Sequence, residues 1–343
     1  MLPLLILGIA LVAVAAAALY SAMSAAGDDA EKSFDPCHPA GAPVQECPFA
    51  AAKKYPKILN QAAAERARRK YDGLTPEDRK TLDDALATAK SDEERAYIWK
   101  AFAACHTPAE CAAFGKKIQG KSPQWMRDNL SLTGSSTGTG VQQQWHHSCN
   151  ATTVQAVRGQ MDPVYALQVH EENPNFGKVD DIDATKENPT LAQQQKDMLT
   201  SEYSGPTAGK HTGVAVGRGQ AGGGGRWADD LLNNQSGTTG VQYSTTKNPA
   251  NPVTLIDDGL KTGAPVPIVI GNGPGQYTHY VVVTGSDPGP PNTYTIHDPW
   301  SGKTVQRSES DLKNGTINLA GSNQVTAVEV PKSVPTDPMK PPC

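Results

Sequence analysis

The pattern of apolar and polar positions divides the chain into several segments with different expected structures. Residues 2–26 form an uncharged, almost wholly apolar run that is long enough to cross the hydrocarbon core of a bilayer. This run predicts an N-terminal hydrophobic helix, either as a transmembrane anchor, as a cleaved signal or as part of a larger delivered protein. A polar, proline-rich spacer follows at 27–47. We therefore expect a membrane partner through residues 2–26, and a membrane-anchored or secreted protein of bacterial export rather than a purely cytoplasmic one.

A helical pattern begins after the spacer and continues over residues 48–131. Three helix-start signals, at Thr75, Ser91 and Thr107, recur at a spacing of 16 residues. The second and third match the capping box, and the first and third are followed by proline at the first helical position. The segment therefore predicts a small all-α domain of short consecutive helices.

The second half of the chain, residues 141–331, places helical patterns first and strand patterns afterwards. A Gly/Ser/Thr tract at 132–140 predicts a flexible linker before it, and a Pro-rich tail follows at 332–343. Helical patterns start at Cys149 and continue over 162–170, 188–199 and 227–233. β-Branched runs, separated by Gly and Pro clusters, cover 265–270, 278–284, 293–297 and 325–330. The order predicts an α+β domain with an antiparallel sheet.

Charge and composition exclude one function class. The formal net charge is −4, and the sequence shows no basic stripe, so we expect no nucleic-acid partner. The glycine-rich segment 213–225 lacks the Lys-Ser/Thr of a phosphate-binding loop. We therefore predict a mobile loop there, and no cofactor.

The six cysteines of the chain are unevenly placed. An oxidising compartment would favour two local disulfides, Cys37–Cys47 and Cys105–Cys111, although the sequence allows other pairings of these four. A zinc site formed by Cys37, His38 and Cys47 is an alternative, but its spacing matches no standard ligand pattern.

Cys149 stands alone, at the point where a polar loop turns into a helical pattern. A helix N-terminus favours an anion, so a thiol at this position is expected to form a thiolate. His279 begins a buried strand, and Asp298 ends the next one, so a hairpin would place imidazole and carboxylate within reach of each other. Nucleophile, base and orienting carboxylate form the arrangement that nucleophilic catalysis requires.

Gln143 and three histidines complete the candidate residues. The Gln143 amide could donate to a developing oxyanion beside the Cys149 backbone N–H. A metal site built from Cys149 with three histidines is the competing interpretation of the same region; these are His146, His147 and His297. Adjacent histidines on one loop point in different directions, which is poor geometry for one ion.

These residues together resemble the papain-like cysteine peptidase superfamily over about residues 141–331. The resemblance rests on Gln143, on Cys149 six residues later, on the run His279-Tyr280-Val281-Val282-Val283 and on Asp298-Pro299-Trp300-Ser301-Gly302. It is closest to the peptidases that cut double-glycine leaders and to the free-standing domains related to them. That branch usually has Asp before and Gly after the cysteine, where this chain has Ser148 and Asn150.

The resemblance implies a papain-like fold, with a helical lobe that carries the nucleophile packed on an antiparallel sheet. It implies a cysteine peptidase that hydrolyses a protein or peptide substrate with Cys149, His279, Asp298 and Gln143. Acyl transfer or glutamine deamidation by the same triad remains an alternative, and so does a non-catalytic binding module. A free-standing member with a hydrophobic N-terminus is similar to a secreted effector or toxin, whose further partner would be a cognate inhibitor or immunity protein.

Overall fold

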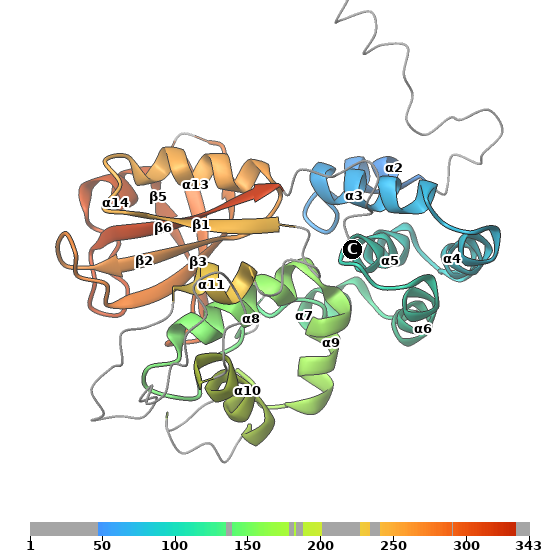
Figure 1. Ribbon diagram of the computed structural model, residues 1–343, viewed down its shortest axis with the longest axis horizontal. Helices are drawn as coiled ribbons and strands as arrows, with labels where there is room; N and C mark the ends of the chain where they lie inside the picture. The colour runs from blue at the N-terminus through green and yellow to red at the C-terminus, as the bar shows by residue number, and fades with distance from the viewer. Residues whose placement is uncertain are drawn as a thin grey trace, which may run out of the picture.

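The computed structural model describes residues 47–134, 139–177, 182, 188–200, 227–233, 241–289 and 291–333. The predicted N-terminal helix at 2–26, most of the spacer, the glycine-rich segment and nearly all of the tail lie outside the described residues. Among the described residues, no helix combines the length and the apolar character that a membrane span requires. The described chain forms an α+β structure, as predicted, with a helical region first and a sheet-containing region after it (Figure 1).

Six short helices form the helical region: α2 (Pro48–Lys54), α3 (Gln61–Asp72), α4 (Pro76–Thr88), α5 (Asp92–Ala103), α6 (Pro108–Ile118) and α7 (Pro123–Asn129). All three predicted starts are confirmed, because Thr75, Ser91 and Thr107 each accept a backbone N–H with the side-chain oxygen. The capping box is reciprocal at Thr107 but not at Ser91. There the Glu94 carboxylate accepts the Lys90 N–H instead.

The helical region has its own apolar core but is also docked on the second half of the chain. Trp99 and Phe102 of α5 are fully buried in that core, which also includes Leu167 from helix α9 (Pro163–Glu172). The His106 ring lies 2.9 Å from the carboxylate of Asp162, the N-cap residue of α9. The two halves therefore share apolar and polar contacts.

The predicted linker at 132–140 is wrong at both of its ends. Leu132 and Thr133 are buried, and Leu132 belongs to the core of the second half. The Val141 N–H donates to the Leu132 carbonyl at 2.7 Å, and the Gly140 N–H donates to the Gly302 carbonyl at 2.6 Å. Leucine is apolar enough to be drawn into a core although the residues around it are polar and small. Both ends of the predicted linker are therefore packed against the second half of the chain.

The second half is built on one six-stranded antiparallel sheet in the order β1-β6-β2-β3-β4-β5. Its strands are β1 (Val241–Lys247), β2 (Val266–Gly271), β3 (His279–Asp287), β4 (Thr293–Asp298), β5 (Lys303–Ser308) and β6 (Gln324–Ser333). The four predicted strands are β2, β3, β4 and β6. The sequence patterns missed β1 and β5, whose residues are largely polar and only partly buried. Strand β6 extends two residues into the predicted tail.

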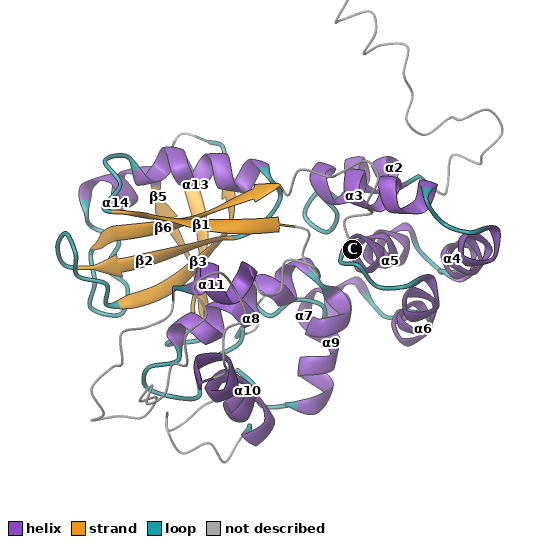
Figure 2. Cartoon of the chain, viewed as in Figure 1, coloured by secondary structure: helices purple, strands orange, loops and turns teal. Residues whose placement is uncertain are grey.

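Helices cover both faces of this sheet (Figure 2). One face packs on α8 (Cys149–Met161) and α11 (Ala228–Asn233), with α9 and α10 (Pro189–Thr200) beside α8. The other face packs on α13 (Pro252–Lys261) and α14 (Glu309–Asn314). Alternate strand residues enter the two cores: Val269, Tyr280 and Val282 on the α8 side, and Ile268, Val281 and Val283 on the α13 side. The sheet is therefore the middle layer of three.

The cysteine pairing differs from the prediction. Cys105 is disulfide-bonded, but Cys111 is a free thiol, so the predicted Cys105–Cys111 disulfide is wrong. Cys111 lies on the core-facing side of α6 and is fully buried, whereas Cys105 sits in a turn with a φ of 74°. The helix thus directs Cys111 into the core. Cys47 is also disulfide-bonded, so it is not the thiolate ligand that the zinc alternative requires. Cys37 lies outside the described residues, so its predicted pairing with Cys47 is not tested.

Candidate functional site

One end of the sheet brings together the residues that the sequence singled out. Cys149 is the first residue of α8, and this helix packs across β3. His279 is the first residue of β3 and Asp298 is the last of β4. The pairing of Val282 with His297 places those two positions at the same end of the antiparallel pair. The predicted hairpin contact is confirmed.

A chain of hydrogen bonds links the three side chains. The Nε2 atom of His279 lies 2.7 Å from Oδ1 of Asp298, and the His279 ring is also hydrogen-bonded to the Cys149 thiol. Because Nε2 is engaged by the carboxylate, Nδ1 is the nitrogen that faces sulfur. Asp298 also accepts the Trp300 N–H at 2.9 Å and the Ser301 hydroxyl at 2.8 Å. The carboxylate is therefore held in one orientation.

Burial and the contact between Cys149 and His279 have opposite effects on the pKa of each of these two groups. Burial alone would raise the pKa of Cys149, but the hydrogen bond and charge of His279 outweigh it, and the N–H groups of Tyr280 and Asn150 add to that effect. The net pKa of the thiol is therefore lowered. Burial would lower the pKa of His279, but its bonds to Asp298 and Cys149 raise it to about 9. The pair thus favours thiolate and imidazolium.

The carboxylate remains ionised for a similar reason. Burial would raise the pKa of Asp298, but the hydrogen bond and charge of His279 outweigh it, and the pKa is lowered. Asp298 is 5% exposed and His279 is 6% exposed, while Cys149 is only half-buried. Cys149 is therefore the least buried residue of the three.

Gln143 is close to this site in sequence but is not placed as an oxyanion donor. It is fully buried, and its Nε2 donates to the carbonyls of Trp145 and His146, both at 2.9 Å. Both amide hydrogens are thereby used to fold the loop before Cys149. Its Oε1 is buried without a hydrogen-bond partner among the described residues. The predicted free donor at Gln143 is not present in this conformation.

The histidines proposed as metal ligands do not converge. His297 is fully buried and donates through Nε2 to the Val141 carbonyl at 3.0 Å, and burial lowers its pKa to about 4. His146 and His147 contact each other edge to face on the loop before Cys149. Within the described ranges, no three His, Cys, Asp or Glu side chains are arranged to hold a metal ion. His297 therefore serves to pin the strand end to the chain segment that leads to Cys149.

Two exposed aromatic residues lie beside the triad. Among the described residues, Tyr277 and Trp300 are the large hydrophobic side chains that remain exposed, at 39% and 38%. Each is two positions from a triad residue. Tyr277 packs edge to face on Trp227, with ring centres 4.9 Å apart, and Trp300 packs on His146 at 5.3 Å. The end of the sheet thus presents aromatic surface next to His279 and next to Asp298.

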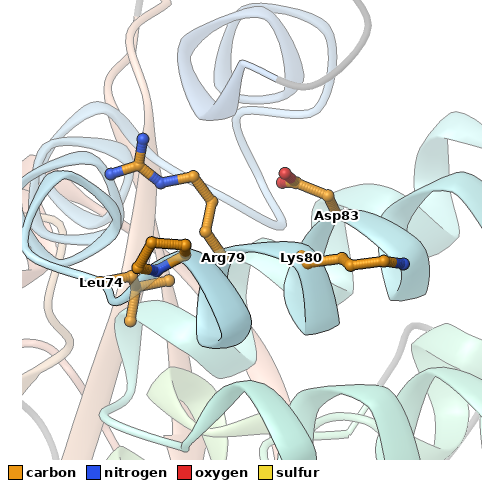
Figure 3. Close-up of a pocket in the computed structure, with 5 residues that line it drawn as sticks. Leu74, Arg79, Lys80 and Asp83 are labelled. Atoms are coloured by element: carbon orange, nitrogen blue, oxygen red, sulfur yellow. The ribbon is translucent and has the colours of Figure 1, made fainter.

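A pocket on the helical region is a weaker candidate for a functional site. It lies on α4 and the turn before it, and is lined by Leu74, Pro76, Arg79, Lys80 and Asp83. The Lys80 side chain extends away from Arg79 rather than toward it (Figure 3). Its lining contains no nucleophile and no histidine, so it offers no comparable chemistry.

The sequence interpretation missed one residue that reaches the site from α10. Gln195 is fully buried and hydrogen-bonds Ser148, directly before the nucleophile, at 2.8 Å. It lies in a run of three glutamines, Gln193 to Gln195, and nothing in that run marks the one that faces inward.

A comparison of the sequence with protein-family models finds no matching family, and a search of curated proteins finds no match.

Proposed function

We propose that this protein is a cysteine hydrolase of papain-like type that cleaves amide bonds in a protein or peptide substrate. The observation that carries the proposal is the hydrogen-bonded series Cys149–His279–Asp298, with a lowered thiol pKa and a raised imidazole pKa. The packing of the nucleophile helix on an antiparallel sheet is the arrangement that the resemblance implies.

The reaction follows from these positions. The Cys149 thiolate attacks the carbonyl carbon, and the carbonyl oxygen takes up the negative charge at the N-terminus of α8, where the Cys149 N–H is available as a donor. The His279 imidazolium gives its Nδ1 proton to the leaving nitrogen as the C–N bond breaks, which leaves a thioester. Neutral His279 then takes a proton from water as the water oxygen attacks the thioester carbon. The C–S bond breaks, the carboxylic product leaves, and the Cys149 thiolate and the His279 imidazolium are restored.

The aromatic surface favours a peptide over a small substrate. Tyr277 and Trp300 expose apolar area next to two different members of the triad. A polypeptide that crosses the end of the sheet would cover both rings, and each would bind an apolar side chain. Acyl transfer and glutamine deamidation use the same thioester, so they differ from hydrolysis only in the amine that leaves and the nucleophile that follows.

The test uses the full chain and a library of peptides, with Cys149→Ser as the matched inactive variant. Mass analysis distinguishes the outcomes: cleavage into two fragments supports hydrolysis, a gain of an amine adduct supports transfer, and a gain of about 1 Da without cleavage supports deamidation. A thiol-specific probe that labels the wild-type protein no faster than free cysteine would contradict all three and would favour a binding module.

A further inference from the structure

Glu329 of β6 carries a carboxyl group that is buried inside the second half of the chain. It is fully buried, and Ala327, two residues earlier on the same strand, belongs to the core on the α8 side of the sheet. Side chains two residues apart on a strand point to the same face, so Glu329 points to that side as well. Its Oε2 has no hydrogen-bond partner among the described residues. A neutral carboxyl is expected here, because an unpaired buried charge is costly.

The ionisable groups around Glu329 also favour its neutral form. Burial has the largest effect and raises the pKa of Glu329 well above its ordinary value, and the charges of Asp229 and Asp230 on α11 act in the same direction. The hydrogen bonds from Tyr280 and Ala228 oppose this rise without outweighing it. No cation of the described part of the chain stabilises a charge on Glu329.

Two buried tyrosines complete these surroundings. Burial raises the pKa of Tyr280 on β3 and of Tyr243 on β1, so both phenols are neutral. The Arg66 guanidinium on α3 acts on Tyr243. Glu329 is therefore a buried acid among neutral and acidic groups.

One oxygen of Glu329 joins two further elements of the fold. Its Oε1 accepts the Tyr280 hydroxyl and the Ala228 N–H, both at 3.0 Å. Ala228 is the first residue of α11 and directly follows Trp227, whereas Tyr280 directly follows His279 on β3. The carboxyl thus ties the start of α11 to the strand that carries the catalytic base.

The residue before α11 supports the aromatic surface beside the triad. The Trp227 ring packs edge to face on Tyr277 and on Tyr280, with ring centres 4.9 Å and 6.5 Å away. The Lys247 ammonium lies over the same indole, 4.5 Å from its ring centre. Trp227 is therefore the support of Tyr277, the exposed ring near His279, and its position depends on where α11 begins.

We propose that Glu329 is a positioning residue, a neutral carboxylic acid that fixes Trp227 and, through it, the Tyr277 ring on which the substrate binds. Its effect on the substrate rests on the proposed function. Glu329 touches neither the triad nor the substrate. A neutral carboxyl suits the position, because its carbonyl oxygen accepts two donors and no charge is buried.

The first test compares Glu329→Gln, which keeps the accepting oxygen, with Glu329→Met, which fills the volume without an acceptor of comparable strength. In the Met variant, the indole N–H signal of Trp227 in an NMR spectrum, assigned with Trp227→Phe, should shift. The KM for a cleaved peptide should rise about threefold to tenfold at little change in kcat. The Gln variant should keep both wild-type values. Thr326→Val is the matched control, because it removes a buried hydrogen bond to the Val269 carbonyl from the same strand.

The second test measures the neutral state of Glu329 from stability. An unfolded glutamate ionises at about pH 4.3. A carboxyl that stays neutral in the folded protein therefore lowers the stability with each pH unit above that value, until the pH passes its raised folded pKa. The melting temperature of the wild type should thus fall relative to that of Glu329→Gln between about pH 5 and about pH 8. A constant difference over this range would mean that Glu329 is ionised when folded, and would overturn the inference.

The other outcomes separate this inference from the proposed function. An unshifted Trp227 signal in Glu329→Met, an equal shift in Thr326→Val, or a shifted signal with an unchanged KM would each contradict the positioning role. A wild-type protein that cleaves no peptide would overturn the proposed function, and the NMR and melting comparisons would still decide the role of Glu329. Should Glu329→Met fail to fold, Tyr280→Phe removes one of the two donors to Oε1, and an unshifted Trp227 signal there would count equally against the inference.

Discussion

His279 Nε2 lies 2.7 Å from Asp298 Oδ1, at the point where β3 begins and β4 ends. Nineteen residues separate the two in sequence, and the hairpin between them closes that distance. The contact fixes which ring nitrogen remains for the thiol. It also explains why an imidazole that is almost wholly buried has a raised pKa, because the carboxylate stabilises its charged form.

The three triad residues are expected to contribute unequally to kcat. Cys149→Ala should abolish hydrolysis, and His279→Ala should cost nearly as much, since the two act as one unit. Asp298→Ala should be less severe by roughly a factor of 100, because that residue orients the ring without touching the substrate. Steady-state kinetics on a cleaved peptide gives the three values. His147→Ala, on the loop before Cys149, is the control, and a His147 requirement beside a dispensable His279 would refute the assignment.

The pH dependence follows from the two shifted pKa values. The thiolate exists above the lowered pKa of Cys149, and the imidazolium exists below the His279 pKa of about 9. Activity should therefore rise at a pH below the ordinary thiol range and decline as the pH passes about 9, when the proton for the leaving nitrogen is lost. The profile of kcat/KM measures both limbs. A single rise at the pH of an ordinary thiol, without the alkaline decline, would be incompatible with a preformed ion pair.

The exposed aromatic side chains should affect substrate binding more than chemistry. Removal of either ring, by Trp300→Ala or Tyr277→Ala, should raise KM about tenfold, since each would bury an apolar side chain of the substrate. The value of kcat should change little because neither side chain belongs to the triad. Tyr55→Ala, on the helical region, serves as a control for the loss of an aromatic ring. If all three variants had the same KM, the substrate would not contact Tyr277 or Trp300.

Leu132 should matter for stability although it lies in a tract of glycine, serine and threonine. It is fully buried in the core of the second half, so Leu132→Ala should lower the free energy of unfolding by about 2–5 kcal/mol. Thr139→Ala, at an exposed position of the same segment, should cost less than about 0.5 kcal/mol. Chemical denaturation measures both. If the two variants had equal free energies of unfolding, Leu132 would not be packed in the core, and the segment would be a flexible linker as the sequence predicts.

The sequence predicted elements better than it predicted side-chain partners. The sequence predicts the helix starts at Thr75, Ser91 and Thr107 because a capping side-chain oxygen accepts a backbone N–H only three residues further along the chain. The contact between His279 and Asp298 was readable because two adjacent strand patterns imply a hairpin. Both inferences depend only on residues that are close in sequence: the cap on the first turn of a helix, and the contact on a hairpin between consecutive strands.

Other features depend on tertiary contacts that no local pattern encodes. Strand β1 is polar at most positions and is fixed by pairing with β6, the last strand of the sheet. Gln143 has the residue type of an oxyanion donor, but two nearby carbonyls take its amide hydrogens. The short spacing of Cys105 and Cys111 favours a disulfide between them, whereas the helix that carries Cys111 directs its side chain into the core. The first case depends on strand pairing and the other two on the direction of a side chain, and residue spacing gives neither.

The most direct test of the central claim is the alkylation rate, as a function of pH, of Cys149 and Cys111, the free thiols among the residues that the structure describes. Cys149 has a lowered pKa, whereas burial raises the pKa of Cys111 to about 12. Iodoacetamide followed by peptide mass mapping should show Cys149 modified at neutral pH and Cys111 unmodified, and His279→Ala should move the Cys149 pKa upward. If Cys149 reacts no faster than Cys111 in the folded wild-type protein, or if its pKa is unchanged in His279→Ala, the thiolate–imidazolium account is contradicted.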